Sequence, residues 1–186
     1  MTRFYNRVVA KRTTQKWVMD LDPKALTAAE ISGNRGTKWP FKSYEAFWYP
    51  EHDICEGPIR DEGGAARQFD IVIADQVWEH LDFPYRATRN VRDMLKPGGH
   101  FLVVTPFYVK YHPAPTDCSR WSARGLKNLL IEAGFPEDGI RAEQWGNRQC
   151  AEADFGPKWG RYDGARHSLE NDPDFPVMSW ALARRD

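Results

Sequence analysis

The 186-residue sequence has no excess of charge of either sign, because lysine plus arginine and aspartate plus glutamate both number 26. Proteins that bind nucleic acid usually carry a basic excess on one face, so we expect no polynucleotide partner, although a local basic patch is compatible with this balance. No apolar run approaches the roughly 18 residues of a membrane-spanning helix. The first residues also lack the apolar centre of a secretory signal. We therefore expect no membrane partner and a cytoplasmic location.

Residue patterns that bind metals or form disulfide frameworks are also missing. Cys55, Cys118 and Cys150 are far apart, odd in number and without a CxxC pair. They indicate free thiols in a reducing compartment rather than a zinc knuckle or a disulfide scaffold. The five histidines are scattered without HxxxH spacing, so we predict no metal site.

The apolar pattern predicts an alternation of helices and strands. An amphipathic helix is expected within 3–20, in an N-terminal segment that spans 1–24, and further helices are expected at 84–95 and 122–133. The expected strands lie at 25–32, 43–49, 69–74, 100–105, 140–145 and 175–183. Ser122 is a plausible helix cap, Gly134 closes that helix, and Lys96–Gly99 predicts a helix stop and turn.

This order is typical of a mostly parallel sheet with helices on both faces. The run FDIVIA at 69–74 is nearly continuous in apolar residues, which predicts a central strand that is buried on both sides. The last two strands have no clear helix between them and suggest an antiparallel hairpin at one edge. Ligands of such sheets bind at the carboxyl ends of the strands, so the residues that follow each strand are the candidates for function.

Three stretches carry a family resemblance: FDIVIADQVWEHL at 69–81, LKPGGHFLVVTP at 95–106 and WSARGLKNLLIEAGF at 121–135. They resemble the class I S-adenosylmethionine-dependent methyltransferases, and are most similar to the small bacterial members that methylate metabolites. The resemblance implies a single α/β domain over 1–186 with a Rossmann-like, doubly wound, mostly parallel seven-stranded sheet and an antiparallel edge strand. It also implies the cofactor S-adenosylmethionine and methyl transfer to a hydroxyl or amine of a small metabolite, such as a sugar or a natural-product intermediate.

The family's cofactor loop follows the first strand, with an acid and then glycines at alternate positions. Here the acid is Glu30, and Ser32, Asn34 and Gly36 stand at the glycine positions, with Gly33 between them. Serine is small and asparagine tolerates a left-handed backbone, so close approach to a ligand is still allowed. The resemblance implies that these residues surround the methionine end of the cofactor, with Glu30 near its amino group. Alternatively, Glu30 caps the backbone amides of its own loop.

The resemblance implies adenosine contacts after the second strand. Either Glu51 holds the ribose hydroxyls, or Tyr49 holds them together with backbone groups. Asp53 is the candidate for the adenine amino group, with Ile54 packed on the ring, although aspartate is also common in ordinary turns.

The family places the cofactor near the run that follows the central strand, here Asp75, Gln76, Val77 and His80. His80 and its neighbour Glu79 could equally have a structural role.

In the family pattern, residues 105–121 follow the fifth strand and begin at the edge of the sheet where ligands bind. His112 is the candidate general base for a hydroxyl acceptor, because an imidazole can take a proton near neutral pH, and Asp117 is the second candidate. A purely structural His112 that hydrogen-bonds its loop is the alternative. Residues 146–172, rich in aromatic and charged side chains, are expected to cover the acceptor.

The expected partner is therefore a small-molecule acceptor, and a homodimer is left open. The sequence leaves two alternative functions. One is a cofactor-binding partner subunit without transfer chemistry, which the unusual glycine loop suggests. The other, a nicotinamide-dependent enzyme, is disfavoured because that cofactor's pyrophosphate needs the glycine fingerprint more strictly.

Overall fold

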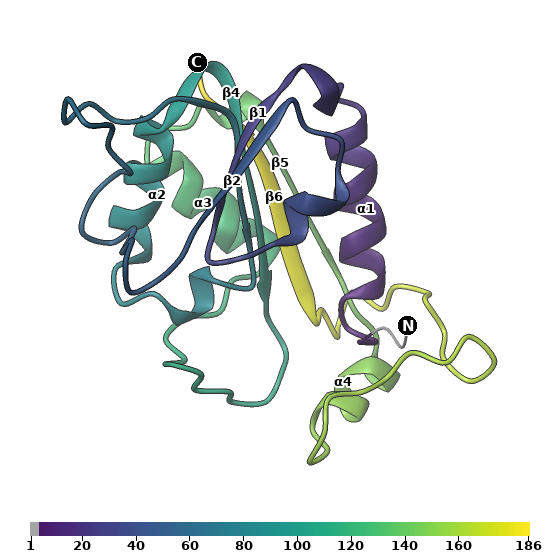
Figure 1. The fold of residues 1–186 in the computed structure, drawn as a ribbon. Coiled ribbons are helices and arrows are strands. Elements are labelled where there is room, and N and C mark those ends of the chain that lie inside the picture. The colour runs from purple at the N-terminus through teal and green to yellow at the C-terminus, as the bar shows by residue number, and fades with distance from the viewer. Residues whose placement is uncertain (1–3) are drawn as a thin grey trace.

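Six strands form one mixed sheet in the order β2-β1-β3-β4-β6-β5 in the computed structural model, which describes residues 4–186 (Figure 1). The strands are β1 (Thr27–Ile31), β2 (Ser43–Phe47), β3 (Phe69–Asp75), β4 (Leu95–Pro106), β5 (Ile140–Trp145) and β6 (Met178–Arg184). The helices are α1 (Val8–Met19), α2 (Pro84–Asp93), α3 (Ala123–Glu132) and α4 (Arg148–Asp154).

The described sheet corrects two details of the expected topology. It has six strands, not seven, and its antiparallel strand, β6, lies between β4 and β5 rather than at the edge. Residues 48–68, between β2 and β3, form no further strand, and within them the glycines and charged residues of 57–67 make turns and a single bridge between Arg60 and Ala66. Such a segment has too little apolar surface to bury as a strand. The late antiparallel pair, β5 with β6, is confirmed.

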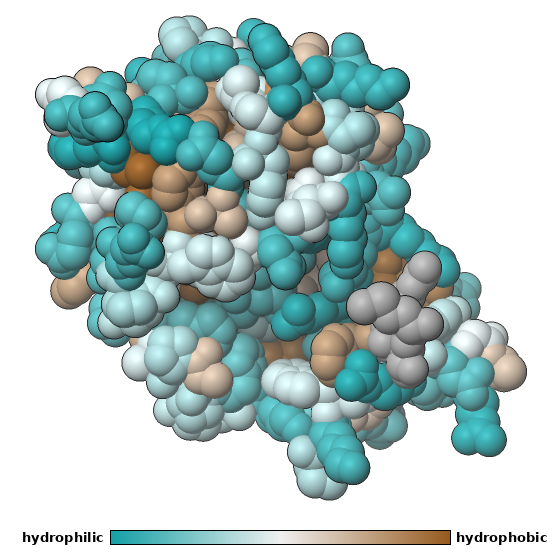
Figure 2. Space-filling view, in the orientation of Figure 1, coloured by the Kyte–Doolittle hydropathy of each residue, from teal (hydrophilic) through white to brown (hydrophobic). Residues whose placement is uncertain are grey.

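Helices cover both faces of the sheet: α2 and α3 lie on one side and α1 on the other (Figure 1). The sequence of β3 is continuously apolar because both faces of this strand are buried. Ile71 and Ile73 join the core beneath α1, whereas Val72 and Ala74 join the core beneath α2 and α3. The central position predicted for this strand is therefore confirmed. On the face shown in Figure 2, the exposed surface is mostly hydrophilic and its apolar residues are scattered.

Local sequence signals set most element boundaries. Ser122 caps α3, because its Oγ accepts a hydrogen bond from the Gly125 amide at 3.2 Å, and Gly134 ends that helix with φ of +99°. Residues 96–99, expected as a turn, instead belong to β4, where a register shift against β3 and a φ of +78° at Gly98 take up the extra residues. The expected helix at the N-terminus begins at Val8, and residues 1–3 of that prediction lie outside the described residues.

Two connections depart from the usual helical crossover between parallel strands. Residues 32–42, between β1 and β2, form only a short 3₁₀ turn at Arg35–Lys38, and residues 48–68, between β2 and β3, contain no α-helix. In contrast, the long connection from β5 to β6 contains α4, which the sequence did not predict. No helix among residues 4–186 is long and apolar enough to cross a bilayer.

Candidate active site

A cavity of about 390 Å³ opens at the carboxyl ends of β1 and β3, and we call it the strand-end cavity. It gathers residues from four separate parts of the chain: the ends of the two strands, the segment after β2 and the loop at 114–116. Seven of the residues predicted from the sequence line it: Ser32, Tyr49, Asp53, Ile54, Gln76, Val77 and His80. The position of the cavity is the one expected for a ligand of a parallel sheet.

The backbone at both strand ends is left-handed at residues that are not glycine. Ser32 has φ of +49° and Gln76 has φ of +66°. Each is held by its neighbouring strand, because the Ser32 amide donates to the Phe47 carbonyl at 2.8 Å and the Gln76 amide donates to the Val104 carbonyl at 2.8 Å. Such residues cost free energy and cluster at functional sites. Ser32 thus adopts the conformation for which the family's glycine is suited.

Glu30 is fully buried and organises the loop after β1. Its Oε1 accepts the Arg35 amide at 2.9 Å, and its Oε2 accepts the Gly36 amide at 2.7 Å and the Tyr44 hydroxyl at 2.8 Å. These contacts match the alternative in which the carboxylate caps its own loop.

The glycines of this loop make room for that carboxylate. A Cβ at Gly33 would lie 2.2 Å from Glu30 Oε1, and a Cβ at Gly36 would lie 2.2 Å from the Tyr44 ring. Close packing inside the loop therefore explains both glycines. Four of the residues predicted for the methionine end are outside the cavity lining: Glu30, Gly33, Asn34 and Gly36.

The segment after β2 supplies a carboxylate and an apolar side chain to the strand-end cavity. Asp53 uses Oδ1 to accept a hydrogen bond from the Cys55 amide at 2.8 Å, which is a turn contact. Ile54 is buried beside it, with its carbonyl held by the Asn90 side chain at 2.7 Å. Tyr49 lines the cavity, whereas Glu51 is exposed and lies outside the lining.

Two imidazoles, those of His80 and His112, lie one behind the other from the cavity outward. His80 lines the cavity, and its Nδ1 donates to the Thr116 carbonyl at 2.5 Å, which leaves Nε2 as the nitrogen that can accept a proton. The ring of His112 lies 5.1 Å from that of His80 and 5.4 Å from that of Trp159. Burial lowers the pKa of His112, which keeps its imidazole neutral. His112 itself is outside the cavity lining.

Asp117 is fixed by its neighbours. Its carboxylate pairs with the Arg120 guanidinium and accepts the His112 amide at 2.8 Å. Burial tends to raise the pKa of Asp117, but the hydrogen bonds from Arg120 and from the His112 amide outweigh burial and hold this pKa below its usual value. Asp117 is therefore a weak base that positions the loop carrying His112.

The most unusual carboxylate is that of Glu79, for which the sequence left a functional and a structural role equally open. Glu79 is fully buried, and neither of its oxygens has a hydrogen-bond partner among the described residues. Burial raises the pKa of Glu79 to about 8, with Arg7 and Arg120 opposing the shift and Asp75 adding to it. The only sequence signal for this group was its place directly after the central strand. Within residues 4–186, no three His, Cys, Asp or Glu side chains gather in a way that could hold a metal ion.

Asp75 ends β3 but faces away from the strand-end cavity lining. Its Oδ2 pairs with Arg35 Nη1 at 3.2 Å, with both side chains about nine-tenths buried. The predicted site residues thus divide into a group that lines the cavity and a group that supports the loops around it.

Comparison with known proteins gives a family for this arrangement. The profile of a family described as "Methyltransferase domain" matches residues 2–103, which is more than half of the chain. Among curated proteins, the reducing polyketide synthase BOA6 of Botryotinia fuckeliana is 36% identical over 50 residues, equal to 27% of this chain and 2% of the synthase. The chain thus matches only a small part of that relative's length.

Solved structures share the fold. A S-adenosylmethionine-dependent methyltransferase from Archaeoglobus fulgidus superposes with a TM-score of 0.60 at 13% identity, over 96% of this chain and 94% of the other. The 1,6-didemethyltoxoflavin-N1-methyltransferase of Burkholderia thailandensis, solved with its substrate and S-adenosylhomocysteine, gives a TM-score of 0.59 at 10% identity, over 96% of this chain and 79% of the other. At these identities the likeness concerns the fold.

Proposed function

The chain belongs to the class I S-adenosylmethionine-dependent methyltransferases, and from that premise we propose that it methylates a hydroxyl or amine of a small metabolite. The observation that carries the proposal is the strand-end cavity, which holds an acid, apolar surface and an imidazole within one enclosure of about 390 Å³. Cavities of this size are typical of small-molecule sites.

The residues of the cavity fit the cofactor. Asp53 offers one carboxylate oxygen to an amino group, and Ile54 and Val77 offer apolar surface to a ring. Tyr49 and Ser32 stand where ribose hydroxyls are expected, with the Tyr49 amide donating to Ser32 Oγ at 3.2 Å. When bound, S-adenosylmethionine supplies an electrophilic methyl group on a positively charged sulfur, which suits a cavity with carboxylates in its lining.

The imidazoles serve the acceptor. A hydroxyl must lose its proton as it attacks a methyl group, and a base within reach speeds such a step by typically about 10²–10⁴-fold. His80 is the group that lines the cavity, and its Nδ1 donates to the Thr116 carbonyl, so Nε2, which lies 3.7 Å from Glu79 Oε1, is the nitrogen that accepts the proton. The neutral ring of His112 lies 5.1 Å from the His80 ring and holds it in place. His112 is itself the base, as the sequence suggested, only for an acceptor that extends beyond His80.

Calorimetric titration with S-adenosylhomocysteine, S-adenosylmethionine and NAD tests the premise. We expect micromolar binding of the first two, about −7 to −8 kcal/mol, and none of NAD. Absence of binding by either methyl-cofactor form would contradict the proposal.

Turnover tests the imidazoles. Release of S-adenosylhomocysteine is measured against a panel of hydroxyl and amine acceptors. His80→Ala is expected to lower kcat by about 10²-fold or more with little change in cofactor affinity, and His112→Ala by less. Equal activity of His80→Ala and the wild type would remove His80 from the mechanism.

The unusual loop favours one alternative, a cofactor-binding partner subunit without transfer chemistry. Serine and asparagine replace two expected glycines, and the loop is closed upon Glu30. Such a protein would bind S-adenosylhomocysteine yet turn over no acceptor in the panel.

A further inference from the structure

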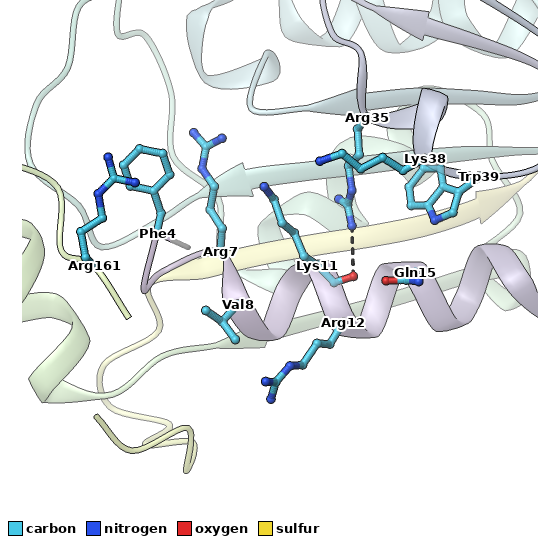
Figure 3. A pocket seen from close by; sticks show the side chains of 10 residues that line it. All are labelled: Phe4, Arg7, Val8, Lys11, Arg12, Gln15, Arg35, Lys38, Trp39 and Arg161. Atoms are coloured by element: carbon cyan, nitrogen blue, oxygen red, sulfur yellow. Dashed lines mark hydrogen bonds between the residues drawn. The ribbon is translucent and has the colours of Figure 1, made fainter. Parts of the chain in front are cut away.

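A second cavity, larger than the first and of about 630 Å³, lies between α1 and the short turn after β1 (Figure 3). We call it the basic groove. Its cationic lining residues are Arg7, Lys11, Arg12, Arg35, Lys38 and Arg161, and among residues 4–186 no acid lines it. The rings of Phe4 and Trp39 stand toward its two ends (Figure 3).

The shortened crossover creates this space. Parallel strands are usually joined by a helix that packs against the sheet, but here only the 3₁₀ turn Arg35–Lys38 follows β1. Arg35 is buried and reaches from this turn toward α1, where its Nη2 donates to the Lys11 carbonyl at 3.2 Å (Figure 3). The groove therefore has a cationic wall on each side, one from α1 and one from the turn.

Much of this positive charge is not neutralised by the protein. Arg35 is paired with Asp75, but Arg7, Lys11 and Lys38 make no ion pair with a carboxylate in the part of the chain that the structure describes. Burial lowers the pKa of Lys11; Asp75 opposes this shift, and the neighbouring cations, Arg7 among them, add to it. Cations held close together without carboxylates repel one another, and an anionic ligand relieves that repulsion.

The groove adjoins the reaction site through residues 75–80. On the groove side, Arg35 bonds Asp75 at 3.2 Å, and the charge of Arg7 acts on the carboxyl of Glu79. On the other side, Gln76 and His80 line the strand-end cavity. A ligand in the groove would thus be separated from the strand-end cavity, where the methyl group is transferred, by residues 75–80 alone.

We propose that the basic groove binds the phosphate of a phosphorylated methyl acceptor. This inference rests on the proposed function and names its substrate class. Three cations without a carboxylate partner match a phosphate ester, which carries a charge of about −1.5 to −2 at neutral pH, better than a single carboxylate. Arg7 can bind two phosphate oxygens at once, and the lysines add point charges.

Inorganic pyrophosphate is the probe, titrated into protein that is already saturated with S-adenosylhomocysteine. Saturation occupies the cofactor's own carboxylate subsite, so any pyrophosphate binding reports another site. Arg7→Gln combined with Lys11→Gln is expected to weaken pyrophosphate binding by about tenfold or more. Lys38→Gln, on the opposite wall, is expected to weaken it as well without disturbing α1.

Lys16→Gln is the matched control, because Lys16 is an exposed lysine of α1 that does not line the groove. It should leave pyrophosphate affinity unchanged, and all variants should keep wild-type affinity for S-adenosylhomocysteine. Unchanged pyrophosphate affinity in both groove variants overturns the proposal. An equal loss of S-adenosylhomocysteine affinity also overturns it, because the groove would then hold the cofactor's carboxylate. If the wild type does not bind S-adenosylhomocysteine, that different result contradicts the proposed function instead.

Discussion

The strand-end cavity and the basic groove flank residues 75–80 but differ in charge. Asp53, Glu56 and Asp82 are among the residues that line the first, whereas the described residues that line the second include six cations and no acid. The chain as a whole has zero formal net charge. A balanced composition thus says little about local fields, because tertiary structure can sort the charges to opposite sides of one strand end.

Removal of Arg35 should have the largest effect, because this buried side chain lines the basic groove and pairs with Asp75 at the end of β3. Arg35→Ala leaves Asp75 buried without its cation and removes the hydrogen bond to Thr14. Loss of one partner of a buried pair costs about 3–5 kcal/mol. Urea denaturation should show that decrease in the free energy of unfolding, while Lys38→Ala, an exposed neighbour, changes it by less than about 0.5 kcal/mol. A decrease in the free energy of unfolding below about 1 kcal/mol for Arg35→Ala would mean that the Arg35–Asp75 pair contributes little to stability.

Glu79 is fully buried in the segment 75–80 and should make stability depend on pH. Its pKa is about 8 in the folded protein against 4.5 for an ordinary glutamate, so the folded state keeps a proton that the unfolded state releases. Stability should therefore fall between pH 4.5 and 8, by up to about 1.4 kcal/mol per pH unit from this group.

Glu79→Gln removes that dependence. Urea denaturation at pH 5, 6.5 and 8 should show the variant gaining stability relative to the wild type as the pH rises, with little difference below pH 4.5. The groups that act on Glu79 are the same in both proteins: the charges of Arg7, Arg120 and Asp75, and the imidazole of His80, whose Nε2 lies 3.7 Å from Glu79 Oε1. Parallel curves for the two proteins would show that the carboxylate has an ordinary pKa.

Asp53 tests the acidic side of the comparison. Asp53→Ala should weaken S-adenosylhomocysteine binding by about 10- to 100-fold, because a hydrogen bond to a charged group contributes about 1.5–3 kcal/mol. Glu51→Ala is the control, since Glu51 is exposed and outside the cavity. Calorimetry that shows equal losses for both variants would assign the effect to general charge rather than to a contact in the cavity.

The smallest effect concerns the backbone at the cavity's edge. Ser32 has φ of +49°, a conformation that costs residues with a Cβ about 1 kcal/mol or more relative to glycine. Ser32→Gly should therefore raise the free energy of unfolding by up to about 1 kcal/mol and leave pyrophosphate binding in the basic groove unchanged. Thermal and urea denaturation measure the first effect, and a decrease in stability would show that the Ser32 side chain contributes more than its backbone strain costs.

Most of the fold could be predicted because its signals are local. The apolar run at 69–74 marked a central strand, and Ser122 and Gly134 marked both ends of α3. The seventh strand was expected from the family resemblance alone, and residues 48–68, between β2 and β3, form no strand. Helix α4 was not predicted because it has only seven residues, which show little apolar periodicity.

The candidate site was predictable to the extent that strand ends mark it. Ser32, Gln76 and His80 follow strands directly, and all three line the strand-end cavity. Glu30 also ends a strand region, but its carboxylate turns into the loop and accepts three hydrogen bonds there. Sequence position locates a residue at an edge, whereas the side chain's direction depends on which donors are near.

The sequence by itself determined the alternation of elements, the buried central strand and the edge of the sheet where ligands bind, because hydrophobic periodicity and turn residues act over a few positions. Tertiary structure alone decided that Arg7 and Lys11 face Lys38 across a groove, and that Arg35 reaches Asp75. Those contacts join segments that are far apart along the chain. Their energies depend on burial and on the distance between charges, and neither quantity exists until the chain has folded.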